Sequence, residues 1–393
     1  MVERLRRGGV AIAVGALVVA GCDLGRAAVV HPAPSRLVEV VDVNGDGALD
    51  VVTAGPGAHR VLLNDGAGGL KDGAPVPVDA EIAAFAIADL DRDGAADRID
   101  VTHTATGSSS LLLARGDGAG GFGAQEVAVA DALTEVATAL DVVDIDGDGD
   151  QDVVLAGHGF DVFRNDGTGS LTRSRGSFGI CGSNSSGGHY SALLTQLTHA
   201  DIDRDGDEDV VMAGGCEETE NLGPSPGVWL QSNDGTGRFV YGSGAGGNGA
   251  VPYVGLSVGD VDEDGHLDFI AGNPSTSAVD IVRGDGRGSF VGRTTVATPS
   301  PPGDVAVADI DGDGHLDVVV TAAGTGFARV LYGDGTGSFP ESHVLATGGD
   351  VVGPVAVGGI DGDGSVDLVF GNDVSTADSS VAVLVNTLDG RQH

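Results

Sequence analysis

The sequence contains few basic and few aromatic residues, and each shortage excludes some classes of function or of core. It contains one lysine, Lys71, and only 20 Lys plus Arg against 58 Asp plus Glu, which gives a net charge of −38. This balance argues against nucleic acid as a partner, because nucleic-acid-binding proteins carry basic patches. It also argues against a basic helix lying on a membrane surface. Aromatic residues make up only 4% of the chain, so Val, Ala and Leu must build the core.

Glycine is abundant, with 68 residues in a chain of 393. Each glycine inside a helix costs about 1 kcal/mol relative to alanine, so long helices are not expected. The acidic residues occur at fixed spacings beside Val-rich runs, which indicates an ordered fold rather than disorder.

The N-terminus has the pattern of an export signal. An apolar run from Val10 to Ala20 follows Arg4, Arg6 and Arg7, and eleven residues are too few to span a bilayer. The run ends in Val19-Ala20-Gly21-Cys22, which resembles the bacterial lipobox, whose cysteine is acylated. We therefore expect a lipoprotein signal peptide over residues 1–21, lipidation of Cys22, and an anchor segment with a closing strand over 22–35. The chain would be a membrane-anchored lipoprotein of the bacterial cell envelope, on the periplasmic or cell-surface side.

Besides Cys22 the chain has two cysteines, Cys181 and Cys216. An exported protein meets an oxidising compartment, so a disulfide between these two is the default expectation. Two unrelated buried thiols are the alternative.

The rest of the chain repeats one acidic motif, Asp-x-Asp/Asn-x-Asp-Gly-x-x-Asp, at intervals of 47 to 59 residues. The acidic or amide positions of the seven copies are Asp42, Asn44, Asp46 and Asp50; Asp89, Asp91, Asp93 and Asp97; Asp144, Asp146, Asp148 and Asp152; Asp201, Asp203, Asp205 and Asp209; Asp260, Asp262, Asp264 and Asp268; Asp309, Asp311, Asp313 and Asp317; and Asp361, Asp363 and Asp367. The seventh copy has Gly359 at its first position.

A second motif, such as Asn165-Asp166-Gly167-Thr168-Gly169, follows each acidic loop. Asp-Gly between apolar runs is a strong hairpin signal. Each repeat is therefore predicted to contain four strands, which is the size of a propeller blade. Two of these hairpins read Arg115-Gly116-Asp117 and Arg283-Gly284-Asp285, tripeptides found in integrin ligands, and we interpret them as hairpin variants.

This pattern resembles the FG-GAP/VCBS repeat family, the calcium-loop propellers of integrin alpha-chain N-terminal regions and of many bacterial surface proteins. The resemblance implies an all-β, seven-bladed β-propeller over residues 36–393, with the acidic loop between the first two strands of each blade. The seventh repeat is too short for a fourth strand. The apolar stretch from Ala27 to His31 is the spare segment that would close the ring.

The acidic loops are predicted to bind about six or seven structural Ca²⁺ ions. Alternating carboxylates converge on one point, and an all-oxygen site suits calcium, whereas zinc requires His or Cys. The alternative is a solvated acidic turn without metal, and this alternative applies most to the incomplete seventh loop. In the second loop, Asp100 competes with Asp97 for the closing position.

Residues 181–253 differ from the other repeats in their extra length and their aromatic residues, and we interpret this region as a ligand face. The aromatic and acidic residues there are Tyr190, Glu217, Trp229, Tyr241 and Tyr253. Variable loops on a rigid scaffold are where binding residues concentrate, although core aromatics in tolerated insertions explain the same pattern. The leading hypothesis is a non-enzymatic binding, adhesion or scaffold protein with an unknown protein or glycan ligand. The alternatives are a lectin-like carbohydrate binder and a polysaccharide lyase or hydrolase.

Overall fold

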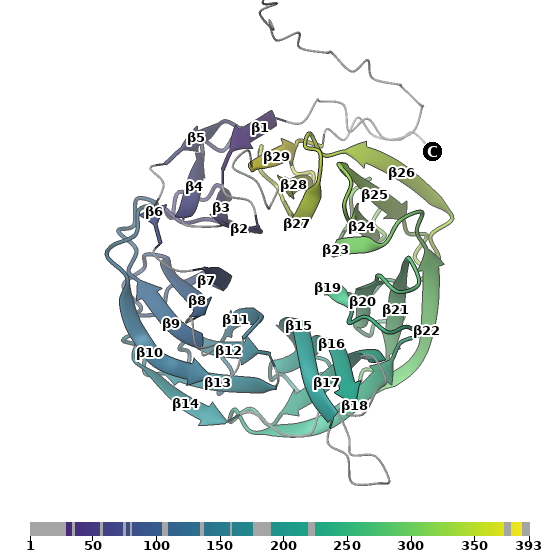
Figure 1. Cartoon of the computed structure of the whole chain (residues 1–393), viewed down its shortest axis with the longest axis horizontal. Helices are drawn as coiled ribbons and strands as arrows, with labels where there is room; N and C mark the ends of the chain where they lie inside the picture. Colours follow the sequence, from purple (N-terminus) through teal and green to yellow (C-terminus); the bar gives the residue numbers. More distant parts are fainter. Residues whose placement is uncertain are drawn as a thin grey trace, which may run out of the picture.

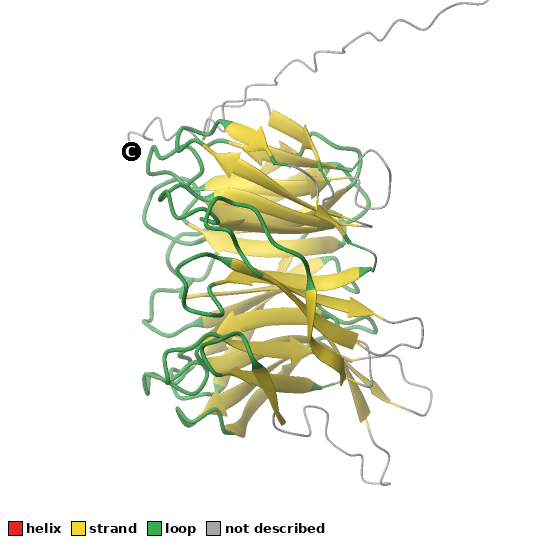
Figure 2. Ribbon diagram, turned by 90° about the vertical axis from the view of Figure 1, so that its left-hand side faces the viewer, coloured by secondary structure: helices red, strands yellow, loops and turns green. Residues whose placement is uncertain are grey.

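A computed structural model describes residues 29–33, 36–55, 58–73, 76–78, 81–103, 109–133, 137–157, 159–175, 190–218, 225–372 and 379–386. These residues form seven antiparallel sheets arranged in a ring, a seven-bladed β-propeller (Figure 1). Seen from the side, the blades form a disc with loops at both faces (Figure 2). The predicted fold class is confirmed. Among the described residues there is no helix long and apolar enough to cross a membrane.

In blades 1 to 6 the strands follow chain order from the innermost strand outward, and in blade 7 the outermost strand is the N-terminal one. Blades 1 to 4 consist of β2 (Leu37–Val41), β3 (Asp50–Gly55), β4 (Ala58–Asn64), β5 (Leu70–Asp72) and β6 (Val76–Pro77); β7 (Ile82–Ala88), β8 (Asp97–His103), β9 (Ser109–Ala114) and β10 (Glu126–Leu133); β11 (Ala139–Val143), β12 (Asp152–Ala156), β13 (Phe160–Asn165) and β14 (Leu171–Arg175); and β15 (Tyr190–Ala200), β16 (Asp209–Glu218), β17 (Ser225–Asn233) and β18 (Phe239–Gly246).

The remaining three blades follow the same order. They consist of β19 (Val254–Gly259), β20 (Asp268–Asn273), β21 (Ala278–Gly284) and β22 (Phe290–Ala297); β23 (Pro302–Ala308), β24 (Asp317–Ala322), β25 (Phe327–Tyr332) and β26 (Glu341–Ala346); and β27 (Val352–Gly358), β28 (Asp367–Asn372), β29 (Ser380–Leu384) and β1 (Val29–Pro32).

The ring is closed by the N-terminal strand, as predicted. β1 pairs antiparallel with β29 from Val29 opposite Val383 to Pro32 opposite Ser380. The first and last parts of the chain therefore share blade 7, which joins the two ends of the ring.

The burial of each strand follows from its place in the blade. The second strands are buried at nearly every position, as in β3 and β28, because both of their faces pack against neighbouring blades. The outer strands β22 and β26 are mostly exposed. The core is consequently divided into clusters between adjacent blades, such as the cluster around Phe163 and Leu113 between blades 2 and 3.

Candidate metal centre

The seven acidic motifs form the connections between the first and second strands of the seven blades. We number these connections loop 1 to loop 7 by blade, and number the positions of the motif from its first residue, which is Asp42 in loop 1 and Gly359 in loop 7. Position 6 is glycine in every loop, with φ between 85° and 94°. This left-handed conformation is open to glycine at little cost, and it turns the chain so that the residues before and after it face each other.

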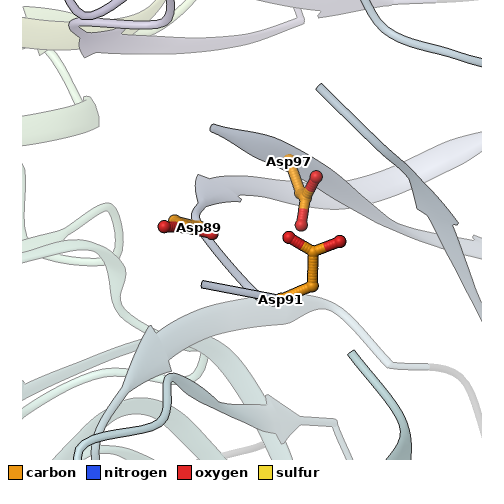
Figure 3. A group of neighbouring side chains, drawn as sticks. All are labelled: Asp89, Asp91 and Asp97. Carbon is orange, nitrogen blue, oxygen red and sulfur yellow. The ribbon is translucent and has the colours of Figure 1, made fainter. Parts of the chain in front are cut away.

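In five loops, positions 1, 3 and 9 bring their carboxylate oxygens within 4.8 Å of one another. Figure 3 shows this arrangement in loop 2, where Asp89, Asp91 and Asp97 point toward one another. The other four groups are Asp144, Asp146 and Asp152; Asp201, Asp203 and Asp209; Asp260, Asp262 and Asp268; and Asp309, Asp311 and Asp317. The predicted convergence is therefore present for three of the four ligand positions.

Position 9 is the first residue of the second strand and is fully buried. In loop 3, Asp152 accepts hydrogen bonds from the N–H of Ile145 at 3.2 Å and of Asn165 at 2.7 Å. Burial raises the pKa of Asp152 to about 6, and it raises the pKa of Asp209, Asp268 and Asp317 to about 7. Each of these carboxylates thus lies close to the carboxylates at positions 1 and 3, in surroundings that disfavour its negative charge. A bound cation would offset that charge.

Position 5 does not join these groups. In loop 3, Asp148 accepts a hydrogen bond from the N–H of Asp150 at 2.8 Å, and Asp205 and Asp264 do the same with Asp207 and His266. The position 5 carboxylate therefore closes its own turn. Sequence spacing alone placed it with the other ligands, because the spacing does not show which carboxylates are turned toward backbone N–H groups.

The second loop closes on Asp97, as the motif predicts, and not on Asp100. Asp100 lies buried between blades 1 and 2, where it contacts His59 at 2.9 Å and Arg98 at 3.1 Å. The suggestion that Asp100 shares the closing role is therefore wrong.

Several buried carboxylate oxygens in these loops have no hydrogen-bond partner. They include Oδ1 of Asp201 and of Asp203 in loop 4, Oδ1 of Asp146 in loop 3 and Oδ1 of Asp260 in loop 5. A buried acceptor without a donor is costly, and a hard cation with oxygen ligands would satisfy it. The residues of these loops thus fit a calcium ion.

The family model described as an FG-GAP-like repeat matches five segments: residues 42–99, 144–212, 201–271, 260–320 and 309–370. Each segment begins at position 1 of an acidic loop and extends through the next loop. The chain belongs to the FG-GAP-like repeat family. No curated protein sequence is significantly similar to it.

The solved structures that share the propeller fold include the following two. One is a lectin of Agrocybe aegerita that recognises non-reducing terminal N-acetylglucosamine. It is 19% identical, with a TM-score of 0.56 over 91% of this chain and 87% of the lectin. The other is BBS1N in complex with ARL6DN, at 12% identity and a TM-score of 0.59, over 93% of this chain and 97% of that chain.

Two of the FG-GAP-like repeats have incomplete loops. Loop 1 has Asn44 at position 3, and its side-chain amide bonds Asp46 at 3.0 Å. Loop 7 has Gly359 at position 1, and there Asp367 accepts N–H bonds from both Ile360 and Asp361, at 2.6 and 3.2 Å. Neither loop brings three acidic residues together within the described part of the chain.

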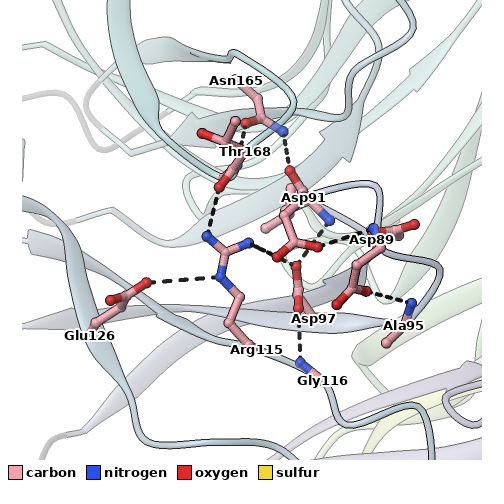
Figure 4. Close-up of polar contacts among 12 residues, drawn as sticks. Asp89, Asp91, Ala95, Asp97, Arg115, Gly116, Glu126, Asn165 and Thr168 are labelled. Carbon is pink, nitrogen blue, oxygen red and sulfur yellow. Dashed lines mark hydrogen bonds and ion pairs between the residues drawn. The ribbon is translucent and has the colours of Figure 1, made fainter.

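Three FG-GAP-like repeats place an arginine against their acidic loop, which sequence analysis missed. Arg115 Nη1 lies 2.7 Å from Asp91 Oδ2 and 3.4 Å from Asp97 Oδ2 (Figure 4). Arg164 contacts Asp146 at 3.2 Å, and Arg283 contacts Asp262 at 3.4 Å. All three immediately precede the first residue of the hairpin motif, and this shared offset is the signal that could have revealed them.

The candidate ligand face is corrected in part. Trp229 is only 7% exposed and packs in the core between blades 3 and 4. Tyr253 is fully buried, and its hydroxyl donates a 2.6 Å hydrogen bond to Asp280. These two residues serve the core and are not available to a surface ligand. The side chains of Tyr190, Glu217 and Tyr241 lie outside the described part of the structure, so their role stays a prediction.

Cys216 is disulfide-bonded. It lies in β16, opposite Ala192 of β15 and Ser225 of β17. Cys22 and Cys181 lie outside the described residues, as does the signal segment 1–21, so the predicted pairing of Cys216 with Cys181 stays a prediction.

Proposed function

We propose that the protein is a calcium-stabilised propeller that is exported, anchored through lipid on Cys22, and binds a protein or glycan partner. The observation that carries the calcium assignment is the set of five carboxylate groups at positions 1, 3 and 9. The buried, unpartnered oxygens of Asp201 and Asp203 support it. In this proposal calcium is structural, because the ion would neutralise acidic loops that anchor the first two strands of each blade.

Export and anchoring rest on other features. The sequence from Arg4 to Cys22 supports a lipoprotein signal, and the disulfide of Cys216 suits an oxidising compartment. Replacing Cys22 by Ser would then move the protein from the detergent phase to the aqueous phase in a detergent partition experiment. Equal partitioning of parent and variant would remove the anchor from this proposal.

The partner is proposed from the fold and its neighbours. One structural neighbour is a lectin that recognises a sugar, and the other binds a protein, so a ligand-binding role suits this scaffold. The lectin-like and polysaccharide-degrading alternatives would be separated from a protein-binding role by a glycan array and a polysaccharide degradation assay. Both would use the residue 22–393 chain with Cys22→Ser, with and without calcium.

Thermal unfolding tests the calcium assignment. We expect the melting temperature of this chain to be higher in millimolar Ca²⁺ than in EDTA by at least about 10 °C, because several sites bind only the folded state. Asp203→Asn should reduce this difference. The control Asp234→Asn changes an exposed hairpin aspartate of the same blade and should leave it intact. A melting temperature that is the same in EDTA and in calcium would exclude structural calcium.

A further inference from the structure

We propose that the protein binds a small carboxylic acid in a groove between blades 5 and 6. The apolar part of the acid fills the groove, and its carboxylate pairs with Arg329. The groove has a volume of about 190 Å³ and lies between the connection from β22 to β23 and the strands β24, β25 and β26 (Figure 1). It is at the face opposite the acidic loops, because β24 runs from Asp317 in loop 6 to Ala322 at the groove. The inference is independent of calcium, since the described residues that line the groove belong to no acidic loop.

One row of side chains on blade 6 forms the floor of the groove. Val320 of β24 lies opposite Arg329 of β25, and Arg329 lies opposite Val344 of β26. Side chains that are directly opposite on paired strands point to the same side of the sheet. Val320 packs in the core with Val279 and Ile281 of β21, so this row faces blade 5. Arg329 is therefore flanked by a valine on either side.

The rest of the lining is largely apolar, and its two walls are joined by the backbone. Phe327 of β25 lines the groove although it is 52% exposed, and Pro299 lines it from blade 5. The N–H of Ala323, directly after β24, donates to the carbonyl of Pro301 at 2.9 Å. This bond connects blade 6 to the segment that supplies the opposite wall. The groove is thus formed before a ligand enters, which reduces the cost of binding.

Arg329 carries a positive charge that the rest of the groove does not neutralise. Its Nη1 donates to Ser342 Oγ at 2.7 Å, and within the described part of the chain no carboxylate pairs with it. The described residues that line the groove include no Asp or Glu. The chain has 58 acidic residues and only 20 Lys plus Arg, so an arginine without a carboxylate partner is unexpected in this protein.

Equivalent residues in two other blades show what Arg329 lacks. The residue four positions before the hairpin motif is Arg60 in blade 1, Asp161 in blade 3 and Arg329 in blade 6. Arg60 contacts Asp72 at 3.5 Å, and Asp161 pairs with Arg173 at 2.7 Å. In both blades the outer part of the same sheet supplies the opposite charge. In blade 6 the carboxylate of a ligand would supply it.

The chemistry of the groove defines the class of ligand. A guanidinium binds a carboxylate through two parallel charge-assisted hydrogen bonds. The side chains of Val320, Val344 and Phe327 suit a hydrocarbon group rather than a sugar, because sugar hydroxyls would find few partners there. Pockets for drug-sized ligands begin at about 300 Å³, so this groove fits a smaller acid with a phenyl or branched aliphatic group.

The experiment measures binding of 3-phenylpropionate to the residue 22–393 chain carrying Cys22→Ser, by ligand-observed NMR titration in millimolar Ca²⁺. We expect a single site with a Kd of about 1 mM or tighter. The alcohol 3-phenylpropan-1-ol lacks the carboxylate and acetate lacks the apolar group, so each should bind at least about tenfold more weakly, equivalent to about 1.4 kcal/mol.

Two variants assign the site. Arg329→Met should weaken binding of the acid about tenfold and leave binding of the alcohol unchanged. Its matched control, Arg60→Met, removes the equivalent arginine of blade 1 and should leave both unchanged. Val344→Glu places a carboxylate opposite Arg329 at an exposed position, so it should abolish binding of the acid while the arginine stays in place.

Three results would overturn the inference. They are no binding of 3-phenylpropionate to the parent chain, equal affinity for the acid and the alcohol, and unchanged binding of the acid in Arg329→Met. If Arg329→Met does not fold, unchanged binding of the acid in Val344→Glu is decisive instead. None of these results changes the proposed function, whose calcium assignment is tested separately by the melting temperatures in EDTA and in calcium.

Discussion

The aspartate at position 9 has two roles that single substitutions can separate. Its carboxylate belongs to the candidate metal group, and it also joins the loop to the third strand through backbone N–H bonds. The aspartate at position 5 closes only its own exposed turn. The two positions look alike in the motif, but they differ in burial.

Asp152→Ala is therefore expected to destabilise the fold whether calcium is present or absent. It leaves the buried N–H groups of Ile145 and Asn165 without an acceptor, at a cost of about 2–5 kcal/mol in the free energy of unfolding. Asp148→Ala should cost less than about 1 kcal/mol in EDTA and more in calcium if position 5 moves to the ion. Urea unfolding in EDTA and in calcium measures the free energy of unfolding of both variants. If Asp148→Ala is as unstable in EDTA as Asp152→Ala, the proposed difference between positions 5 and 9 is wrong.

Among the elements, β1 is the one whose pairing partner is most distant in sequence. It supplies the fourth strand of blade 7, and the β29 strand on which it packs is buried at every residue. Without β1, the edge of β29 would offer unpaired backbone groups to another molecule.

A chain beginning at Ala33 should consequently melt at least about 5 °C below one beginning at Val29. It should also self-associate through the open edge of β29. Thermal unfolding and size-exclusion chromatography of the two chains measure these effects. Equal melting temperatures together with a monomeric elution volume for both would show that β1 does not hold the ring closed.

The sequence was sufficient to predict the strands, the loops and the ring closure, because each depends on local patterns that repeat. The glycine at position 6 and the Asp-Gly hairpins fix local turns, and the Val-rich runs between them form strands. The contact between Arg115 and Asp91 was not predictable in this way, because it depends on how the end of the third strand lies over the loop between the first two. The burial of Trp229 and Tyr253 agrees with the core alternative and not with the ligand face. The sequence could not decide between the two, because both residues lie beside insertions that resemble binding loops.

Across the whole molecule, side-chain amides connect neighbouring loops. The amide of Asn165 donates to the carbonyl of Leu90 in loop 2 at 2.7 Å, and that of Asn233 donates to Ile145 in loop 3 at 2.7 Å. Asn64 and Asn386 make the same bond to Ile360 and Ile310. Each of these asparagines also bonds its own loop, so the order of one loop is linked to that of the preceding blade.

The interface between blades 1 and 2 is built differently. Blade 2 has Gly116 where these other blades have asparagine. The same interface buries His59, Arg98 and Asp100 as a charged group. Burial lowers the pKa of His59 and counteracts the effect of the neighbouring Asp100. Blades 5 and 6 also have glycine at this position, Gly284 and Gly333, so the buried group of ionisable side chains rather than the missing amide bond distinguishes this interface.

All seven innermost strands contribute residues to the lining of a central cavity with a volume of about 350 Å³. Three acidic residues lie in its wall: Glu39 on β2, Asp141 on β11 and Asp304 on β23. Asp141 is paired with His199 at 2.9 Å, and Asp304 accepts the N–H of Val355 at 3.0 Å. Burial raises the pKa of Asp304 to about 6. These positions look like ordinary polar strand residues in the sequence, and only the closing of the ring brings them together.

Glu39 gives the clearest pH-dependent prediction, because burial raises its pKa from 4.5 to about 8, with the charge of Asp141 adding to the effect. The folded protein therefore holds a proton at Glu39 between about pH 4.5 and pH 8 that the unfolded chain releases. The free energy of unfolding accordingly falls as pH rises through this window. Glu39→Gln keeps an acceptor for the N–H of Ile87 without the proton, so it should raise the free energy of unfolding by about 1–3 kcal/mol at pH 7.5 and by almost nothing near pH 4.5. Urea unfolding across this pH range measures the difference in the free energy of unfolding between the parent and Glu39→Gln, with the exposed Glu341→Gln as the control. A difference that does not vary with pH would show that Glu39 titrates normally in the folded ring.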